Sequence, residues 1–299
     1  MNAHPTHPSS RSDVIAIPHR SGPLTRWLAL APLLAIAVAP GAGAVSLSIT
    51  LDLGSGFSPS QVSAIHAARD AWQSWLYDYQ PAVLEAGPRP NPVVTVQTFT
   101  DALGGVLAQA GPTEAISQGG FVLATEGIML FDTADLPGLE SSGTFYDVVL
   151  HELAHVLGFG TLWVDNGLYL TAGQYTGTHA LNAWRTEFNQ PDATFVPVET
   201  TGGAGTAHAH WDEVHGGALD TGITQTGTGL DMRFELMTGW LNAPTFVSAT
   251  TLESFRDLGF APVPEPAEVA MVLAGICLGF GLVRGAGRGR WKRFSAVSR

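Results

Sequence analysis

Two histidines and a glutamate stand close together near the middle of the sequence, in the segment His-Glu-Leu-Ala-His at 151–155. Residues four apart lie on one face of an α-helix, so His151 and His155 can present two imidazoles to one cation. Glu152 lies beside them and can reach a water at an open position of a zinc ion. Zinc lowers the pKa of such a water toward about 7, and a carboxylate can accept its proton during attack on a peptide carbonyl. The H-E-x-x-H pattern therefore predicts a zinc site that hydrolyses peptide bonds.

The residues before the motif indicate that this helix is buried. A bare H-E-x-x-H match is equally compatible with two surface histidines on a helix. Here four apolar residues precede the motif, namely Phe145, Val148, Val149 and Leu150. Their spacing predicts a buried helix over 145–157, which favours a metal site inside a domain.

Zinc needs a third protein ligand, and the residues around the motif leave two geometries open. In one, a glutamate on a later helix completes the site, and Glu187 is the candidate. In the other, the motif extends to H-E-x-x-H-x-x-G-x-x-H, as in the metzincins. Gly158 matches the glycine of that pattern and allows the chain to turn back toward the metal. Thr161, however, stands where the third histidine would fall.

Three blocks of sequence taken together resemble the leishmanolysin-like metallopeptidases. The first block covers 151–163, the second is His-Trp-Asp-Glu at 210–213, and the third is Glu-Leu-Met-Thr-Gly at 235–239. The Asp-Leu-Gly-Phe at 257–260 is similar to the end of the domain in that family. Because a long insertion separates the glycine from the third histidine in these proteins, the resemblance also accommodates Thr161.

The resemblance implies a role for each matching residue. His151, His155 and His210 would bind one zinc ion, and Glu152 would be the general base. Met237 would be the methionine of a Met-turn, which forms an apolar floor beneath the zinc and is not a ligand. Without the resemblance, Met237 would be interpreted as an ordinary core residue.

Two further histidines flank the expected third ligand. We interpret His208 and His215 as loop residues or as gating residues near the site, because only one histidine is needed. Trp211 favours His210, since the pair matches the His-Trp of the family. Glu187 remains the alternative third ligand.

The remaining pattern predicts the elements that position these residues. Alternation and apolar runs predict strands, while helical spacing and a Ser58 N-cap followed by Pro59 predict helices. The expected strands cover 45–53, 92–98 and one or two strands within 119–131, and the expected helices cover 58–79, 145–157, 179–188 and 250–258. We therefore expect an α+β fold of the zincin or metzincin type. A mixed twisted sheet would lie over the active-site helix, and a loop-rich C-terminal subdomain with the Met-turn would follow.

The charge distribution excludes one class of partner. Residues 45–262 contain five arginines and no lysine against 23 acidic residues, which leaves a net charge of −18. Nucleic-acid binding depends on Lys and Arg that neutralise phosphates, so we expect no nucleic-acid partner. The single cysteine, Cys277, also rules out a disulfide within the chain.

The first 44 residues are typical of a secretory signal peptide. Arg20 and Arg26 precede a short apolar run at 27–38, and Ala-Gly-Ala follows at 42–44. The alternative is a permanent membrane anchor, but a span needs about 20 apolar residues. We therefore expect export and cleavage after Ala44, with a catalytic domain over 45–262.

The C-terminal segment, 263–299, resembles the PEP-CTERM sorting signal of Gram-negative bacteria. Pro-Glu-Pro at 264–266 is followed by an apolar run at 267–283 and a basic cluster at 284–293. The resemblance implies transient anchoring in the inner membrane through 267–283, recognition by an exosortase-type enzyme, and a final place at the cell surface or outside the cell. Membrane contact would be limited to the terminal segments. The alternative is a simple C-terminal anchor.

These observations lead to two hypotheses of function. The first is an exported zinc endopeptidase that acts on proteins or peptides through a zinc-activated water. The second is a non-catalytic surface or matrix protein built on a zincin scaffold. Glu152 discriminates between them, because a site that has lost hydrolysis has no reason to keep the base.

Overall fold

The computed structural model describes residues 46–101, 106–214 and 216–263. The predicted signal peptide, the sorting signal from residue 264 onward and His215 lie outside the described residues. Within the described ranges, no helix is both long enough and apolar enough to cross a membrane.

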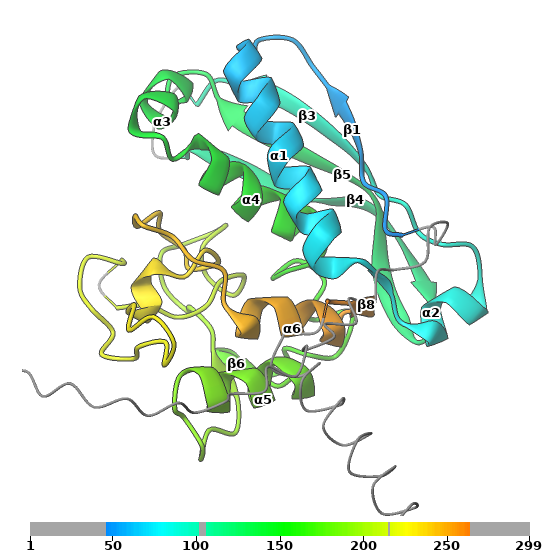
Figure 1. The fold of residues 1–299 in the computed structure, drawn as a ribbon, viewed down its shortest axis with the longest axis vertical. Helices are drawn as coiled ribbons and strands as arrows, with labels where there is room; N and C mark the ends of the chain where they lie inside the picture. The colour runs from blue at the N-terminus through cyan, green and yellow to red at the C-terminus, as the bar shows by residue number, and fades with distance from the viewer. Residues whose placement is uncertain (1–45, 102–105, 215, 264–299) are drawn as a thin grey trace, which may run out of the picture. The chain divides into compact units, whose positions relative to one another are not determined.

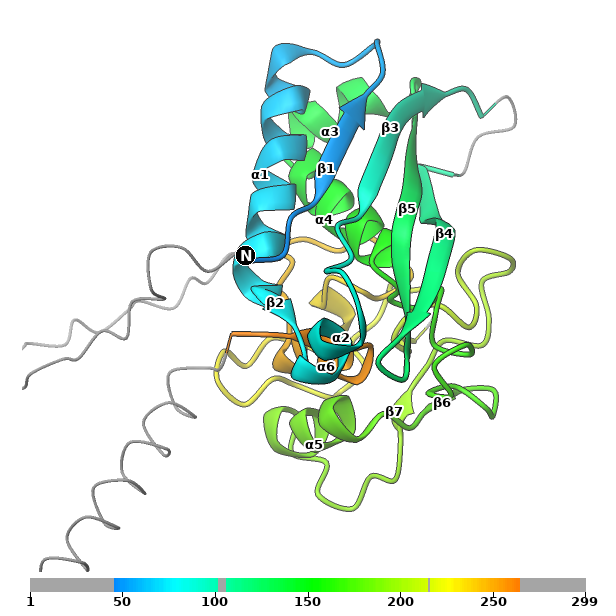
Figure 2. The same ribbon diagram turned by 90° about the vertical axis from the view of Figure 1, so that its right-hand side faces the viewer.

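A four-stranded mixed sheet forms one layer of the fold. Its strands lie in the order β1 (Thr50–Leu53), β3 (Val93–Phe99), β5 (Phe121–Asp132) and β4 (Ala108–Gln118), as Figure 2 shows. Strands β1, β3 and β5 are parallel. A tight turn at Gly119 and Gly120 joins β4 to β5, and these two strands run antiparallel. Strand β4 therefore forms one edge of this sheet.

Two of the sequence predictions for strands need correction. The strand expected over 45–53 begins only at Thr50, because the amides of Leu47 and Ile49 donate to Tyr77 and Gln73 of the neighbouring helix region instead. Strand β4 was not predicted. Its Gly111-Pro112 step and exposed side chains hide the alternation of a strand, and an edge position tolerates such a proline.

Two long helices cover the same face of the sheet (Figure 1). Helix α1 (Pro59–Leu76) begins at Ser58, whose side chain accepts from the amide of Gln61, so the predicted cap is confirmed. Helix α4 (Phe145–Val156) packs against α1, β4 and β5. The indole of Trp72 ties the two helices together by donating to the Leu150 carbonyl at 2.9 Å.

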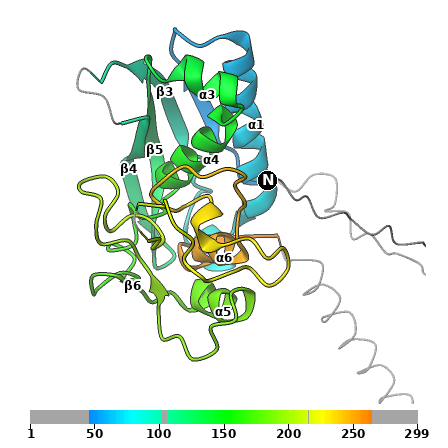
Figure 3. The same cartoon turned by 90° about the vertical axis from the view of Figure 1, so that its left-hand side faces the viewer.

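The remaining elements are short. They are β2 (Asp78–Tyr79), α2 (Pro81–Ala86), α3 (Leu136–Ser142), β6 (Gln174–Tyr175), α5 (Thr178–Glu187), β7 (Val196–Pro197), a 3₁₀ turn at Met232–Phe234, α6 (Ala249–Asp257) and β8 (Phe260–Ala261). The described residues between 158 and 248 lie mostly in loops, as Figure 3 shows. The described residues thus form a mixed α+β fold with six α-helices, as the sequence predicts.

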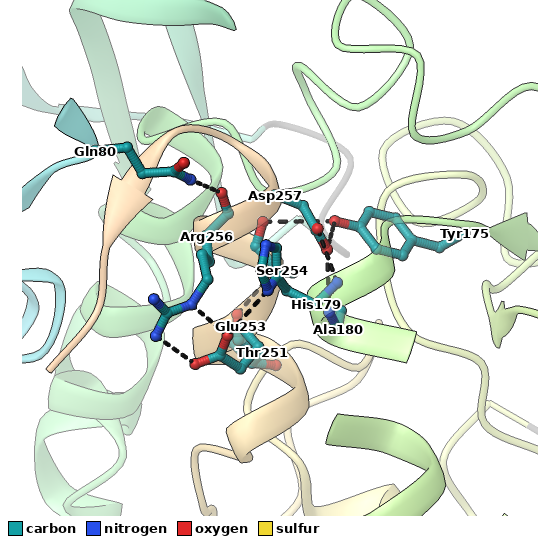
Figure 4. A network of polar contacts seen from close by, with 9 residues as sticks. All are labelled: Gln80, Tyr175, His179, Ala180, Thr251, Glu253, Ser254, Arg256 and Asp257. Carbon is teal, nitrogen blue, oxygen red and sulfur yellow. Dashed lines mark hydrogen bonds and ion pairs between the residues drawn. The ribbon is translucent and has the colours of Figure 1, made fainter. Parts of the chain in front are cut away.

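Helices α5 and α6 pack together and cap one another. Asp257, at the end of α6, accepts from the amides of His179 and Ala180 at the start of α5, and from the Tyr175 hydroxyl (Figure 4). Glu187, at the end of α5, accepts from the first amides of α6 in the same way. Each acidic side chain therefore satisfies the free N–H groups of the partner helix, where negative charge is favourable.

Candidate metal centre

The Nε2 atoms of three histidines meet at one point of the fold. His151, His155 and His210 form a triangle in which each pair of Nε2 atoms is 3.0 Å apart. Among the described residues they form a group whose geometry could hold a metal ion. The structure thus brings together all three histidines that the sequence resemblance assigns to the site.

Helix α4 positions the first two histidines and the glutamate. His151 and His155 lie one turn apart on it, and their rings are 4.7 Å apart between centroids. The opposite side of the helix is buried through Val149, Leu153 and Val156. Because the helix is packed firmly against α1 and the sheet, the two imidazoles have a fixed spacing.

A sharp turn after α4 brings the third histidine to the helix. Gly158 and Gly160 have φ angles of 114° and 73°, in the left-handed region that favours glycine. A Cβ on Gly160 would collide with the backbone of Ala209, the residue before His210. The glycines therefore allow the close approach that places His210 opposite α4.

An aromatic cluster fixes the chain on the other side of His210. Trp211 is fully buried, stacks on Trp163 with ring centroids 5.1 Å apart, and also contacts Phe159 and Tyr175. Its indole N–H donates to the Thr251 hydroxyl at 2.8 Å, so this strongly apolar side chain leaves no unsatisfied donor. The His-Trp pair of the sequence is thus one ligand candidate and the anchor beside it.

Hydrogen bonds to backbone carbonyls determine which nitrogen of each ring is free. The Nδ1 atoms of His151, His155 and His210 lie 2.7, 2.9 and 2.8 Å from the carbonyls of Leu236, Phe159 and Thr206, respectively. A carbonyl can only accept, so each neutral imidazole carries its proton on Nδ1 and exposes a lone pair on Nε2. Three lone pairs 3.0 Å apart cannot bond one another, which makes the triangle suited to a cation.

Burial favours the form of histidine that binds metals. It is the main cause that lowers the pKa of all three rings, and for His210 it brings the pKa to about 3, with a further contribution from His151. Burial also raises the pKa of the Glu152 carboxyl to about 8. Neutral imidazole is the metal-binding form of histidine.

A buried turn at 235–239 forms hydrogen bonds to the segments that carry His151 and His210. Leu236 supplies the carbonyl that holds His151, and the Met237 carbonyl accepts from the Trp211 amide at 3.0 Å. Glu235 is 2 % exposed, and its carboxylate accepts from the Met237 amide and from Ser248 at the start of α6. The turn therefore links two ligand segments, and Met237 itself is completely buried within it.

The centre opens into a cleft of about 680 Å³. The cleft is lined by His151, Glu152, His155 and His210. Residues 106–110, which include the start of edge strand β4 and the two residues before it, also line it. Trp240 and Leu241 line the cleft beyond the turn. A ligand of the size of a short peptide segment can therefore reach the three histidines and the glutamate.

The other candidate ligands have different places in the structure. Glu187 is not part of the centre, because both its oxygens accept from the first residues of α6, so this alternative is wrong. His208 bonds the Tyr169 hydroxyl at 2.7 Å. Thr161 lines the cleft and donates its hydroxyl to the His155 carbonyl at 2.7 Å.

Two buried carboxyl groups near the centre were missed in the sequence. Glu213 accepts from the Gly239 amide at 3.0 Å, and Glu235 holds the turn on its other side. Both lie within the blocks that carry the resemblance, but Gly239 is 26 residues from Glu213 and Ser248 is 13 residues from Glu235. The one local signal is that Glu235 directly precedes two apolar residues, Leu236 and Met237.

No protein-family model matches the chain, and no curated protein matches it. The described residues contain a three-histidine centre that could hold a metal ion, beside a buried glutamate in the same cleft.

Proposed function

We propose that this chain is an exported zinc endopeptidase of the leishmanolysin-like, metzincin type. The observation that carries the proposal is the triangle of His151, His155 and His210 with Glu152 in the same cleft. The order of the motifs along the sequence supports the family, and the mixed α+β fold with the ligand helix beneath the sheet is compatible with it.

The donor set fits zinc. Three nitrogens 3.0 Å apart surround a centre that is about 1.7 Å from each, so one ion can lie at the zinc–nitrogen distance of about 2.0–2.1 Å from all three. Catalytic zinc sites use three protein ligands and keep a fourth position open. The cleft on the same side of the triangle leaves room for that position. The backbone carbonyls that hold each Nδ1 fix the ring orientations in the way that metal-binding histidines require.

The proposed reaction divides the work between the ion and Glu152. Bound zinc would act as a Lewis acid that makes water nucleophilic near neutral pH. The positive charge of a bound ion would lower the raised pKa of Glu152, so that its carboxylate would accept the proton of the attacking water and deliver it to the leaving amine. Glu152 is 7 % exposed and faces the cleft, so its proton transfer takes place away from bulk water.

The edge of the sheet supports a peptide as the substrate. Residues 106–110 line the cleft, and β4 is the last strand on that side of the sheet. An edge strand has unpaired N–H and C=O groups that can bind an extended chain. The substrate's scissile carbonyl would then lie over the histidines.

A non-catalytic binding protein on the same scaffold is the competing function. Glu152 has no ion-pair partner among the described residues, and an unpaired buried carboxylate is unfavourable for stability. Its presence at this position favours catalysis.

The proposal also includes export. The predicted signal peptide would direct the chain out of the cytoplasm, an exosortase-type enzyme would recognise its sorting signal, and the protein would end at the cell surface or outside the cell.

The test is peptide cleavage by the full-length chain loaded with zinc. We expect the wild type to cleave a mixed peptide library, as read by mass spectrometry. Glu152→Ala should reduce the rate by about 100- to 10,000-fold, the usual contribution of a general base, while it keeps its zinc. Glu126→Ala removes an exposed carboxylate from β5 and should be as active as the wild type. Equal cleavage by the Glu152 variant and the wild type, or no cleavage by a zinc-loaded wild type, would contradict the proposal.

A further inference from the structure

One carboxyl group in the cleft has no part in the proposed metal centre. Asp147 lies on α4, four residues before His151, and lines the same cleft as the three histidines and Glu152. Four residues of an α-helix rise about 6 Å along its axis, which is close to the length of two residues of an extended peptide. A peptide bound over the histidines can therefore bring a side chain near its scissile bond within reach of Asp147.

Asp147 is the carboxyl group of the cleft that is left for a ligand. Two other acidic residues line the cleft: Glu152 is the proposed base, and Glu235 uses both its oxygens to accept from Met237 and Ser248. Asp147 is half-buried, and its carboxyl accepts from the side chain of Thr245, which also lines the cleft. A carboxylate has about four lone-pair sites, so this contact leaves acceptor capacity for a further donor.

The described part of the chain supplies no positive charge to Asp147. No ion pair within it involves this residue, and no lysine or arginine of the described residues lines the cleft. Part of the lining consists of Gly202, Ala204 and Gly205, which leave room for a long side chain of a ligand. A basic side chain that enters the cleft would thus meet Asp147 without a competing cation.

We propose that Asp147 makes the cleft selective for peptides that carry an arginine or a lysine within two residues of the scissile bond. The inference rests on the proposed endopeptidase function and names the class of substrate that this site prefers. Arginine is the better partner, because its planar guanidinium can donate two parallel hydrogen bonds to one carboxylate. Salt screens a half-buried pair less than an exposed one, and an acidic side chain at the same place would be repelled.

A negative charge in the first turn of a helix also stabilises that helix, and Asp147 is the third residue of α4. This structural role predicts that a substitution lowers the cleavage of all peptides alike. Selectivity predicts instead that the substitution changes the ratio between basic and acidic peptides. The ratio therefore separates the two roles.

The test uses the zinc-loaded full-length chain and a peptide that the wild type cleaves in a mixed library. Variants of this peptide would carry arginine, glutamine or glutamate at each of the two positions on either side of the scissile bond. At one of these positions at least, kcat/KM should be about tenfold or more higher for arginine than for glutamate. Asp147→Asn should reduce this ratio to about threefold or less, and Asp147→Lys should reverse it. Asp165→Asn, an exposed residue outside the cleft lining, should keep the wild-type ratio.

Two results would overturn the selectivity and leave the endopeptidase function intact. One is a wild type that cleaves the arginine and glutamate peptides equally well at all four positions. The other is a folded Asp147→Asn variant, checked by circular dichroism, that keeps the wild-type ratio; the wild-type ratio alone decides if the variants do not fold. A wild type that cleaves no peptide contradicts the proposed function instead. Fluorescence anisotropy of labelled arginine-rich and glutamate-rich peptides then decides the role of Asp147, and equal binding of the two would overturn it.

Discussion

Replacing Glu235 by alanine should weaken both the fold and the metal centre, although Glu235 is not a ligand. Its carboxylate accepts from the amides of Met237 and Ser248 and from the hydroxyls of Ser248 and Thr251. The two hydroxyls can rotate to other acceptors, but the two buried amides cannot. Each buried amide without an acceptor costs about 1–3 kcal/mol, so Glu235→Ala should lower the free energy of unfolding by about 2–6 kcal/mol. A domain of ordinary stability has about 5–15 kcal/mol.

The same change should reach the histidines through the backbone. Glu235 holds the turn in which the Leu236 carbonyl accepts from His151 at 2.7 Å. Loss of such a supporting contact typically weakens metal affinity by about 10- to 100-fold. Glu235→Gln keeps one acceptor oxygen and should therefore have an intermediate stability and affinity.

Urea denaturation followed by tryptophan fluorescence measures the stability, and competition with a zinc chelator measures the affinity. Glu126→Ala is the matched control and should stay within about 0.5 kcal/mol of the wild type, as exposed substitutions usually do. A Glu235→Ala variant whose stability also stays within that margin would contradict the role of Glu235 in the turn. An unchanged zinc affinity in this variant would refute the link through Leu236 alone.

Three further predictions concern single residues. His210→Ala should lose bound zinc, whereas His208→Ala should keep it, because His208 bonds the Tyr169 hydroxyl outside the centre. Metal analysis of the dialysed proteins measures the zinc content of both variants. A His210→Ala variant that keeps its zinc would contradict the assignment of His210 as a ligand. Glu187→Ala should lower the free energy of unfolding by about 1–2 kcal/mol through the lost cap of α6, with zinc content unchanged; a stability equal to the wild type in urea would contradict the capping role. Burial tends to raise the pKa of Asp231, but four hydrogen bonds outweigh burial and lower it. The carboxylate therefore stabilises the fold at pH values above its unfolded pKa of about 4, and this stabilisation is lost as the pH falls through the lower pKa of the folded state. Asp231→Asn should therefore be less stable than the wild type at pH 7, with a gap that narrows in acid; a gap independent of pH in urea titrations would contradict it.

The local parts of the fold could be predicted from the sequence because their signals are local. The cap at Ser58 and the helix through His151 and His155 depend on residues within one or two turns, and both are present as expected. Strand β4 depends on pairing with β5, and the sequence over 108–118 does not show the alternation of a half-buried strand. It was therefore missed, although it borders the cleft.

The third histidine shows where spacing alone was insufficient. Nothing in the distance between His155 and His210 predicts that they meet, and only the resemblance selected His210 over Glu187. The structure gives the physical reason, because Gly160 allows the backbone of Ala209 to approach and Trp211 anchors the other side. Long-range partners of this kind, like those of Glu235, leave no periodic signal in the sequence.

The zinc coordination of the wild-type protein tests whether His151, His155 and His210 form the proposed metal centre. The full-length chain would be purified, its zinc content measured, and its ligand shell determined by X-ray absorption spectroscopy. We expect one zinc ion per chain, bound by three imidazole nitrogens at about 2.0–2.1 Å and by one further light ligand. A chain that does not retain zinc, or a zinc ion bound by fewer than three histidines, would contradict it.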